Sequence, residues 1–315
     1  MTTPPAQEPF EQTVEQHRAG LRAHCYRMLG SAADAEDALQ ETLLRAWRGL
    51  PQFEGRSSLR GWLYRIATNV CLRMIERRPK RVLPVDYGAA ADPHDELLDA
   101  VAEPIWLEPY PDEPEATYEQ RESVELAFIA ALQHLPARQR AVLLLRDVLG
   151  FAPAEIATAL DATPAAIYSA LQRAHQAVEE RLPERSQQET LRAIGDDGLR
   201  EVVERYVAAW ERSDVDALVA MLADDASFAM PPRPSWYRGR DAIAAFLAAR
   251  PMSRRRGWSH VPVRANGQPA IACYLDGRAH GIDVLTLDAE RRIRAVDAFH
   301  LPHLFAAFGL PERAR

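Results

Sequence analysis

The chain has 315 residues, 47% of them hydrophobic and 26% charged, with a formal net charge of −7. This length exceeds one ordinary domain, so more than one folding unit is expected. No run of about 18 apolar residues occurs, which excludes a membrane-spanning helix, and no secretory signal precedes the first helix, which predicts a cytoplasmic protein. The 3 cysteines are far apart in sequence and are expected to be reduced thiols.

The charge is strongly segregated along the chain. Residues 82–120 hold eleven carboxylates and no Lys or Arg, whereas residues 56–81 hold eight basic residues and the single acid Glu76. Because salt screens charges beyond about 10 Å, a concentrated basic segment attracts phosphate locally. The overall acidity therefore does not exclude a nucleic-acid partner.

Three helices are predicted between residues 10 and 81. The first covers about 11–29 and stops before Gly30, the usual residue just past a helix end. The second covers 34–50, and the third starts after a serine cap and continues through Arg78. The inner stripe of the second helix contains Leu39, Leu43, and Ala46 or Trp47.

Residues 82–119 break the helical pattern. Six prolines stand among the acids, and no periodicity persists. This composition is typical of an extended, mobile linker. Residues 1–9 are expected to form a disordered tail.

Helical patterning returns in residues 120–185. The stretch FAPAEIATALDATPAAIYSALQRA (151–174) predicts two short helices that turn at Asp161, with Thr163 as the second N-cap. This is the helix-turn-helix arrangement, in which the second helix enters the major groove of DNA, although a plain corner of a helical bundle gives the same pattern. The side chains predicted to face DNA are Thr163, Ala165, Ala166, Tyr168, Ser169, Gln172 and Arg173.

The remainder, residues 195–315, changes class after the short break LPERSQQET. Three amphipathic helices are predicted at 198–211, 215–223 and 241–249. Strands separated by turns are predicted at 258–265, 269–274, 282–287 and 293–299. Helices followed by an antiparallel meander indicate an α+β domain, so the predicted fold class is multidomain, with two all-α domains and one α+β domain.

Two long motifs resemble the extracytoplasmic-function sigma factors of bacterial RNA polymerase. DAEDALQETLLRAWRGL and FEGRSSLRGWLYRIATNVCLRMIERRPKR resemble region 2 (10–81), and LPARQRAVLLLRDVLGF with the helix pair resembles region 4 (120–185). The resemblance covers about half of the chain. It implies core RNA polymerase and promoter DNA as partners, no cofactor, and a linker that follows the path of nascent RNA. An ordinary helix-turn-helix transcription regulator is the binding-protein alternative.

The resemblance also implies roles for individual residues. The polymerase-binding positions of the second helix match Asp37, Gln40 and Glu41. The segment matching 53–60 captures an unstacked base of the minus-ten element, and basic side chains near it hold phosphates. Arg73 stands where the family often has Asp, so the minus-ten preference does not carry over. The region 2 candidates for DNA binding are Phe53, Arg56, Ser57, Arg60, Asn69, Arg73, Arg77 and Arg78, with Arg81 as a further phosphate ligand.

Residues 195–315 resemble the SnoaL-like, nuclear-transport-factor-like cone attached to some of these sigma factors. MPPRPSWYRGRDAIAAFL (230–247) and HLFAAFGLPE (303–312) carry this resemblance. Such cones enclose an apolar pocket, for which the candidate residues are Trp236, Tyr237, His260, Tyr274, Asp283, Asp297 and His300. We expect a regulatory or ligand-sensing domain that takes a small molecule.

An enzyme of the isomerase or cyclase type is the alternative for this cone. Asp283 or Asp297 would then act as the general base. An isolated Asp among strands is more often a hydrogen-bonded structural group, so we expect no catalysis. His300 and His303 lack a third ligand at a suitable spacing, so no metal site is expected.

Overall fold

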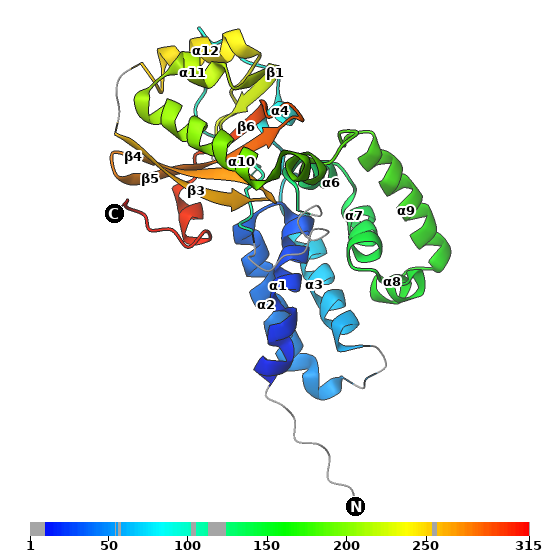
Figure 1. Ribbon diagram of the computed structural model, residues 1–315. Coiled ribbons are helices and arrows are strands. Elements are labelled where there is room, and N and C mark those ends of the chain that lie inside the picture. The colour runs from blue at the N-terminus through cyan, green and yellow to red at the C-terminus, as the bar shows by residue number, and fades with distance from the viewer. Residues whose placement is uncertain are drawn as a thin grey trace, which may run out of the picture. The chain divides into compact units, whose positions relative to one another are not determined.

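The computed structural model describes residues 10–53, 55, 58–101, 105–112, 124–253 and 257–314. They form two compact units (Figure 1). The helical unit comprises the described residues of 1–80 and 131–181, and the sheet unit comprises those of 81–130 and 182–315. The expected tail, residues 1–9, lies outside the described residues.

Three helices make the first part of the helical unit, as the sequence predicts. They are α1 (Phe10–Leu29), α2 (Ala32–Gly49) and α3 (Leu59–Ile75), and each packs against the other two. A short 3₁₀ turn, η1 (Leu50–Gln52), follows α2. The shared core is apolar, because each helix turns one hydrophobic stripe inward.

Serine caps fix where two of these helices begin. Ser31 Oγ accepts a hydrogen bond from Asp34 N at 3.1 Å, and Ser58 Oγ accepts one from Gly61 N at 3.1 Å. Each bond satisfies a backbone N–H that the first turn of a helix leaves free. The second helix therefore starts before the predicted Asp34, and the third ends three residues before the predicted Arg78.

Shorter helices make the second part of the helical unit. They follow α6 (Leu126–Gln133), which crosses the boundary between the two units. The helix pair predicted from residues 151–174 is present as the last two of these helices. The elements are α7 (Ala137–Leu143), the π-helical η2 (Leu144–Val148), α8 (Pro153–Ala159) and α9 (Pro164–Glu179).

The sheet unit is an α+β domain with one six-stranded sheet. The strand order is β2-β1-β6-β5-β4-β3, and β1 pairs with β6 in parallel while the other pairs are antiparallel. The strands are β1 (Leu222–Ala229), β2 (Trp236–Arg238), β3 (Trp258–Ala265), β4 (Gln268–Leu275), β5 (Arg278–Leu287) and β6 (Ile293–Phe299). The helices are α4 (Pro84–Tyr87), α10 (Gln187–Arg212), α11 (Val215–Val219), α12 (Arg240–Ala249) and η3 (Pro302–Ala306).

Two strands and part of a helix were not predicted. The predicted antiparallel meander is present as β3–β6, and β1 and β2 extend the sheet beyond β6. The segment LPERSQQET is also partly helical, since α10 starts after the cap Ser186 and bends at Gly195, where φ is 74°. A left-handed residue of this kind interrupts a helix and favours glycine.

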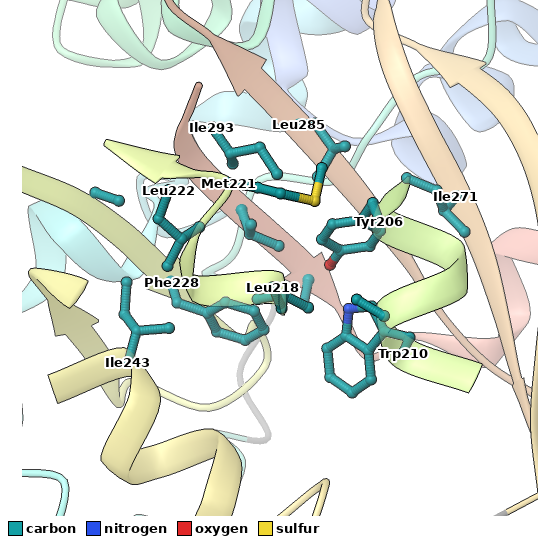
Figure 2. Close-up of a cluster of buried hydrophobic side chains, with 14 of the residues drawn as sticks. Tyr206, Trp210, Leu218, Met221, Leu222, Phe228, Ile243, Ile271, Leu285 and Ile293 are labelled. Carbon is teal, nitrogen blue, oxygen red and sulfur yellow. The ribbon is translucent and has the colours of Figure 1, made fainter. Parts of the chain in front are cut away.

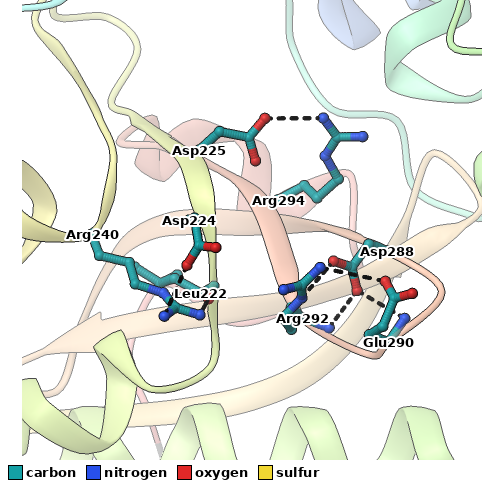
Figure 3. A network of polar contacts seen from close by, with 8 residues as sticks. All are labelled: Leu222, Asp224, Asp225, Arg240, Asp288, Glu290, Arg292 and Arg294. Atoms are coloured by element: carbon teal, nitrogen blue, oxygen red, sulfur yellow. Dashed lines mark hydrogen bonds and ion pairs between the residues drawn. The ribbon is translucent and has the colours of Figure 1, made fainter.

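A bulge in β1 makes this strand difficult to recognise from the sequence pattern. Asp224 and Asp225 are consecutive exposed residues, and the pairing of β1 with β6 shifts between Leu222 and Ser227. Strict alternation is lost at such a bulge. Each acid has an arginine partner (Figure 3): Asp224 pairs with Arg240 at 3.0 Å and Asp225 with Arg294 at 3.2 Å.

Two tight hairpins fix the register of β3, β4 and β5. Asn266 and Gly267 have φ values of 56° and 71°, and Asp276 and Gly277 have φ values of 50° and 72°. Two positive φ angles in a two-residue turn match the twist of the flanking strands. The predicted turn at DGRAHG is therefore shorter than expected, and β5 begins at Arg278.

Helices α10, α11 and α12 cover one face of the sheet (Figure 1). Tyr206 and Trp210 of α10 pack near Ile271 and Leu285 of the strands, and Phe228 continues this core toward α12 (Figure 2). We call this side the helix face and the opposite side the outer face. The helix face is the interior that the cone resemblance implies.

The acidic linker differs from its prediction as a free, mobile spacer. Its described residues pack on the sheet unit, where they bond to both ends of the strand order. At the β2 end, Ala91 N donates to Trp236 O at 2.8 Å and Val101 N donates to Pro232 O at 2.9 Å. Arginines of the domain reinforce this end, since Arg233 Nη1 donates to Leu98 O at 2.6 Å.

The β3 end of the sheet holds the linker through a compact polar cluster. Tyr110 N donates to Asn266 Oδ1 at 2.9 Å, and Asn266 N donates to Tyr110 O at 2.8 Å. Asp112 accepts from Gly267 N at 2.6 Å and pairs with Arg264 at 3.1 Å. The buried backbone of an irregular segment needs such partners, and here the domain supplies them.

The linker also closes on itself. Val82 N donates to Ile105 O at 2.8 Å, and Leu107 N donates to Val82 O at 3.0 Å. Trp106 lies between these bonds and its ring packs 5.2 Å from that of Tyr87. The segment between Val82 and Ile105 is therefore a closed loop.

Candidate functional sites

One side of α9 is fully available to a partner. Thr163 Oγ1 accepts from Ala166 N at 3.2 Å, which confirms the predicted N-cap. Asp161 has a φ of 51°, a left-handed conformation that Asp tolerates better than most residues. Ile167 and Leu171 are buried. All seven predicted groove-facing residues are exposed: Thr163, Ala165, Ala166, Tyr168, Ser169, Gln172 and Arg173.

The outer side of α2 is acidic and partly apolar. Asp37, Gln40 and Glu41 are all exposed. Trp47 is 63% exposed while Ala46 is buried, so Ala46 belongs to the inner stripe and Trp47 to the surface. An exposed Trp is a frequent anchor at protein interfaces.

The DNA-binding candidates in and around α3 differ in their exposure. Arg73 and Arg77 are exposed, whereas Asn69 and Phe53 are half-buried. Phe53 packs against Trp62, with ring centroids 5.0 Å apart. Among these candidates, Arg73 and Arg77 therefore have guanidinium groups that are exposed to phosphate.

Three further basic candidates have other surroundings. Arg78 pairs with the buried Asp34 of α2. Arg81 is buried in the sheet unit, where its Nη1 donates to Trp106 O at 2.6 Å. Arg81 therefore contacts the linker, not phosphate. Arg56 and Ser57 lie outside the described residues.

Arg60 joins region 2 to region 4 within the helical unit. Its Nη2 donates to Leu149 O at 2.8 Å. Its guanidinium carbon is 4.5 Å from the ring centroid of Phe151 and 5.3 Å from that of Tyr64. These are a hydrogen bond and two cation–π contacts. In this state Arg60 is not free to bind the minus-ten element.

Arg140 makes a second, buried connection between the same parts. Its Nη1 donates to Met28 O of α1 and to Gln133 Oε1, the latter at 2.6 Å. Its Nη2 donates to Gln133 O at 3.2 Å and Leu135 O at 3.3 Å. Burial lowers the pKa of Arg140 to about 10, so the guanidinium stays charged at neutral pH. Carbonyl dipoles replace the water that this charge loses.

The two candidate aspartates of the sheet unit point to opposite faces. Residues paired directly across strands share a face, and neighbours along a strand do not. Asp283 pairs with Ile271 and Ala298, which belong to the core under the helices. Asp297 precedes Ala298 along β6 and pairs with Val284, the residue after Asp283. Because neighbours along a strand point to opposite faces, Asp297 lies on the outer face.

The seven predicted pocket residues consequently do not form one pocket, and that prediction was wrong. Alternation along each strand separates them. Tyr237, His260 and Asp283 are on the helix face, whereas Trp236, Tyr274 and Asp297 are on the outer face. His300 follows the end of β6, and its ring centroid is 4.6 Å from that of His280.

Asp283 is a buried acid with local partners. Tyr206 OH donates to Asp283 Oδ2 at 2.7 Å. Burial raises the pKa of Asp283 to about 6, against the opposing effect of hydrogen bonds from Tyr206 and Cys273. Tyr206 and Trp210 are one turn apart on α10, an aromatic pair that the sequence analysis did not single out. In the sequence, their spacing of four residues indicates that both side chains lie on one face of the helix.

Asp297 is buried beneath the linker. Burial raises its pKa to about 7, and the nearby carboxylate of Asp86 adds to the shift. Trp236 Nε1 donates to Gly88 O at 2.9 Å, which holds the linker over this part of the sheet. The two acids repel each other when both are ionised.

No group of three His, Cys, Asp or Glu side chains suited to a metal ion occurs among the described residues. All three cysteines are unpaired and buried. Within the same ranges, none of the helices combines the length and apolarity that crossing a bilayer requires.

Comparisons with known families divide the chain in the same way. Residues 13–81 match Sigma-70 region 2, residues 125–178 match Sigma-70 region 4, and residues 203–303 match the SnoaL-like domain. The solved crystal structure of the extracytoplasmic function sigma factor SigJ of Mycobacterium tuberculosis is similar in fold. Its TM-score is 0.58 at 22% identity, over 96% of this chain and 99% of that one.

The chain is also similar in sequence to curated sigma factors. Over 58% of the chain and 64% of the relative, identity is 30% to the ECF RNA polymerase sigma factor SigE of Mycolicibacterium smegmatis. Over 96% of the chain and 84% of the relative, identity is 44% to the ECF RNA polymerase sigma factor SigG of Mycobacterium tuberculosis. The chain therefore belongs to the ECF RNA polymerase sigma factors and carries a SnoaL-like domain at its C-terminal end.

Proposed function

We propose that this sigma factor directs promoter-specific initiation through two separate DNA-reading surfaces. Region 2 holds the minus-ten element, with Arg73 and Arg77 on phosphates, and region 4 reads the minus-thirty-five element through α9. The exposed side of α9 carries this proposal, because it combines small side chains with Gln172 and Arg173, which can reach base edges. The acidic side of α2 suits a basic surface of core RNA polymerase.

The two regions have to separate for this function. The promoter elements lie about 25 base pairs apart, which is about 85 Å of duplex at ~3.4 Å per pair. Arg60 and Arg140 hold the two regions together in the helical unit. Core polymerase binding would supply the free energy that breaks these contacts, so the free chain is expected to bind promoter DNA poorly.

We further propose that the sheet unit regulates the sigma regions through the linker. The linker joins region 2 to region 4, and its hydrogen bonds with Trp236, Pro232 and Asn266 tie it to the SnoaL-like domain. Anything that favours or opposes this packing changes how far the two regions can move apart. A ligand acts here only through a difference in affinity for the packed and released states.

A catalytic role for the domain has less support. Asp283 already bonds to Tyr206 and Cys273, and Asp297 lies under the linker on the other face. The proposal therefore needs no turnover, and it assigns the protein to the cytoplasm, where RNA polymerase is.

Run-off transcription with core RNA polymerase on genomic DNA tests the main proposal. We expect discrete transcripts that require both the chain and core polymerase. Tight, sequence-specific duplex binding by the free chain, without polymerase-dependent transcripts, would instead identify an ordinary helix-turn-helix regulator.

A double variant, Arg233→Ala with Arg264→Ala, tests regulation through the linker. It removes the bond to Leu98 O and the ion pair with Asp112. We expect altered run-off yield or promoter-complex lifetime. The matched control is Arg292→Ala with Arg294→Ala, which makes the same charge change in the network of Figure 3 without touching the linker. Equal behaviour of the two double variants would refute linker control.

A further inference from the structure

A cavity lies between region 2 and region 4 inside the helical unit. Its volume is about 310 Å³, near the lower end of the range for small-molecule sites. It is bounded by α3 on one side and by η2, the following loop and α8 on the other. The lining residues are Gly61, Trp62, Tyr64, Arg65, Leu145, Phe151, Ala154, Glu155, Ile156, Thr158 and Ala159.

The floor of this cavity is apolar and aromatic. Tyr64, Leu145, Phe151 and Ile156 are buried, and Trp62 is half-buried. The Tyr64 and Phe151 rings are 5.8 Å apart in an edge-on arrangement. Such walls bind flat apolar rings well, because both stacking and edge contacts are available.

The mouth of the cavity carries a charged side chain that has no polar partner among the described residues. Arg65 is exposed, and within the described part of the chain it has neither a hydrogen-bond nor an ion-pair partner. The acid at the mouth is engaged, since Glu155 Oε2 accepts from Ala152 N at 2.7 Å at the start of α8. Thr158 Oγ1 donates to Ala154 O at 3.0 Å. The charged group available at the mouth is therefore a guanidinium, which suits a carboxylate.

We propose that this cavity binds a small aromatic carboxylate, with its ring on Trp62 and Phe151 and its anionic group on Arg65. Both sigma regions contribute walls, so the ligand binds only while the two regions are together. Phe151 also contacts the guanidinium of Arg60. A ring packed on Phe151 therefore strengthens the closed state, in which regions 2 and 4 are held together. Inhibition of transcription is the consequence, and this last step rests on the proposed function.

Three probes with one ring system test the chemistry. They are 2-naphthylacetate, the neutral 2-naphthylacetamide and the cationic 2-(2-naphthyl)ethylamine, each titrated into the full chain and followed by calorimetry. We expect the acetate to bind at least tenfold more tightly than either of the others. Equal affinity for all three, tighter binding of the amine, or no binding of the acetate at millimolar concentration overturns the proposal.

Variants locate the binding site. Arg65→Gln should abolish the preference for the acetate over the acetamide, whereas Arg48→Gln, which changes an exposed arginine of α2 outside the cavity, should leave it intact. Ala159→Leu fills the cavity and should weaken all three probes while the far-UV circular dichroism stays unchanged. If Arg65→Gln and Arg48→Gln behave alike, the acetate binds elsewhere and the site is refuted.

Run-off transcription separates this inference from the proposed function. The acetate should lower the yield with the wild-type chain and have at least fivefold less effect with Arg65→Gln. Arg65-dependent binding without inhibition supports the site and overturns its link to the closed state. Transcription without any acetate binding supports the proposed function and overturns the site. Loss of acetate binding when a partner helix is added, with no Arg65-dependent preference among the probes, would overturn the proposal. It would identify the cavity as a docking site for that helix.

Discussion

The arginines of the helical unit fall into two groups that sequence alone does not separate. Arg60 and Arg140 bond to backbone carbonyls inside the unit, whereas Arg173 on α9 is exposed. All three belong to motifs of the same family. The difference teaches that the predicted DNA-facing side of region 4 is exposed in the free chain, whereas Arg60, a DNA-binding candidate of region 2, is held by internal contacts.

The largest effect is expected from the buried side of this comparison. Arg140→Met leaves the carbonyls of Met28, Gln133 and Leu135 without their donor in a dry site. The free energy of unfolding of the helical unit should fall by about 3 kcal/mol or more. Urea unfolding followed by circular dichroism measures this, with the exposed Arg181→Met as control. An unchanged midpoint would contradict the assigned role.

The exposed acids of α2 give the next largest effect. Asp37→Arg puts a like charge against a basic polymerase surface and should weaken core binding by several kcal/mol, more than 100-fold. Fluorescence anisotropy of the labelled chain titrated with core polymerase measures it. Asp197→Arg is the control, because it makes the same charge change at an exposed site of the sheet unit. Retained affinity would show that these acids are only solvated.

The exposed arginine of α9 should have a more moderate effect. Arg173→Ala should lower promoter-dependent initiation by about 1–3 kcal/mol, with core binding unchanged. Arg181→Ala, past the end of the same helix, serves as the control. Run-off yield at several promoters measures the loss. Unchanged initiation from all of them would mean that this side of α9 contacts something other than the promoter.

The pH dependence of stability concerns the buried acid under the linker. The pKa of Asp297 is raised to about 7 from an ordinary 3.8, so the unfolded chain loses this proton first as pH rises. The stability of the sheet unit therefore falls between about pH 4 and pH 7, by ~1.4 kcal/mol for each pH unit at most. Asp297→Asn should raise the melting temperature more at pH 8 than at pH 5. An equal shift at both values would contradict the assignment.

Much of the fold was predictable because its signals are local. Thr163 and Pro164 mark the start of α9 through cap chemistry that involves only neighbouring residues. Asn266 and Gly267 mark a hairpin for the same reason, and β3 and β6 were predicted with their observed bounds. The class of each domain follows from such signals.

The candidate sites were less predictable because they depend on packing between distant segments. The bulge at Asp224 and Asp225 breaks the alternation that identifies a strand. The faces of Asp283 and Asp297 depend on strand register, which no single segment contains. Likewise, the contacts of Arg60 with Phe151 and of the linker with Asn266 join residues far apart in sequence.

The closed loop of the linker has a mechanical consequence for the tether between the two sigma regions. From Arg81 to Leu126 the fully extended backbone would span about 150 Å at ~3.3 Å per residue. The bonds that join Val82 to Ile105 and Leu107 remove the intervening residues from this contour. With the loop closed, the usable contour is about 70 Å by the same measure. The closed loop therefore holds reserve length. Once the Arg60 and Arg140 contacts are broken, separating the regions beyond this contour would break these few hydrogen bonds.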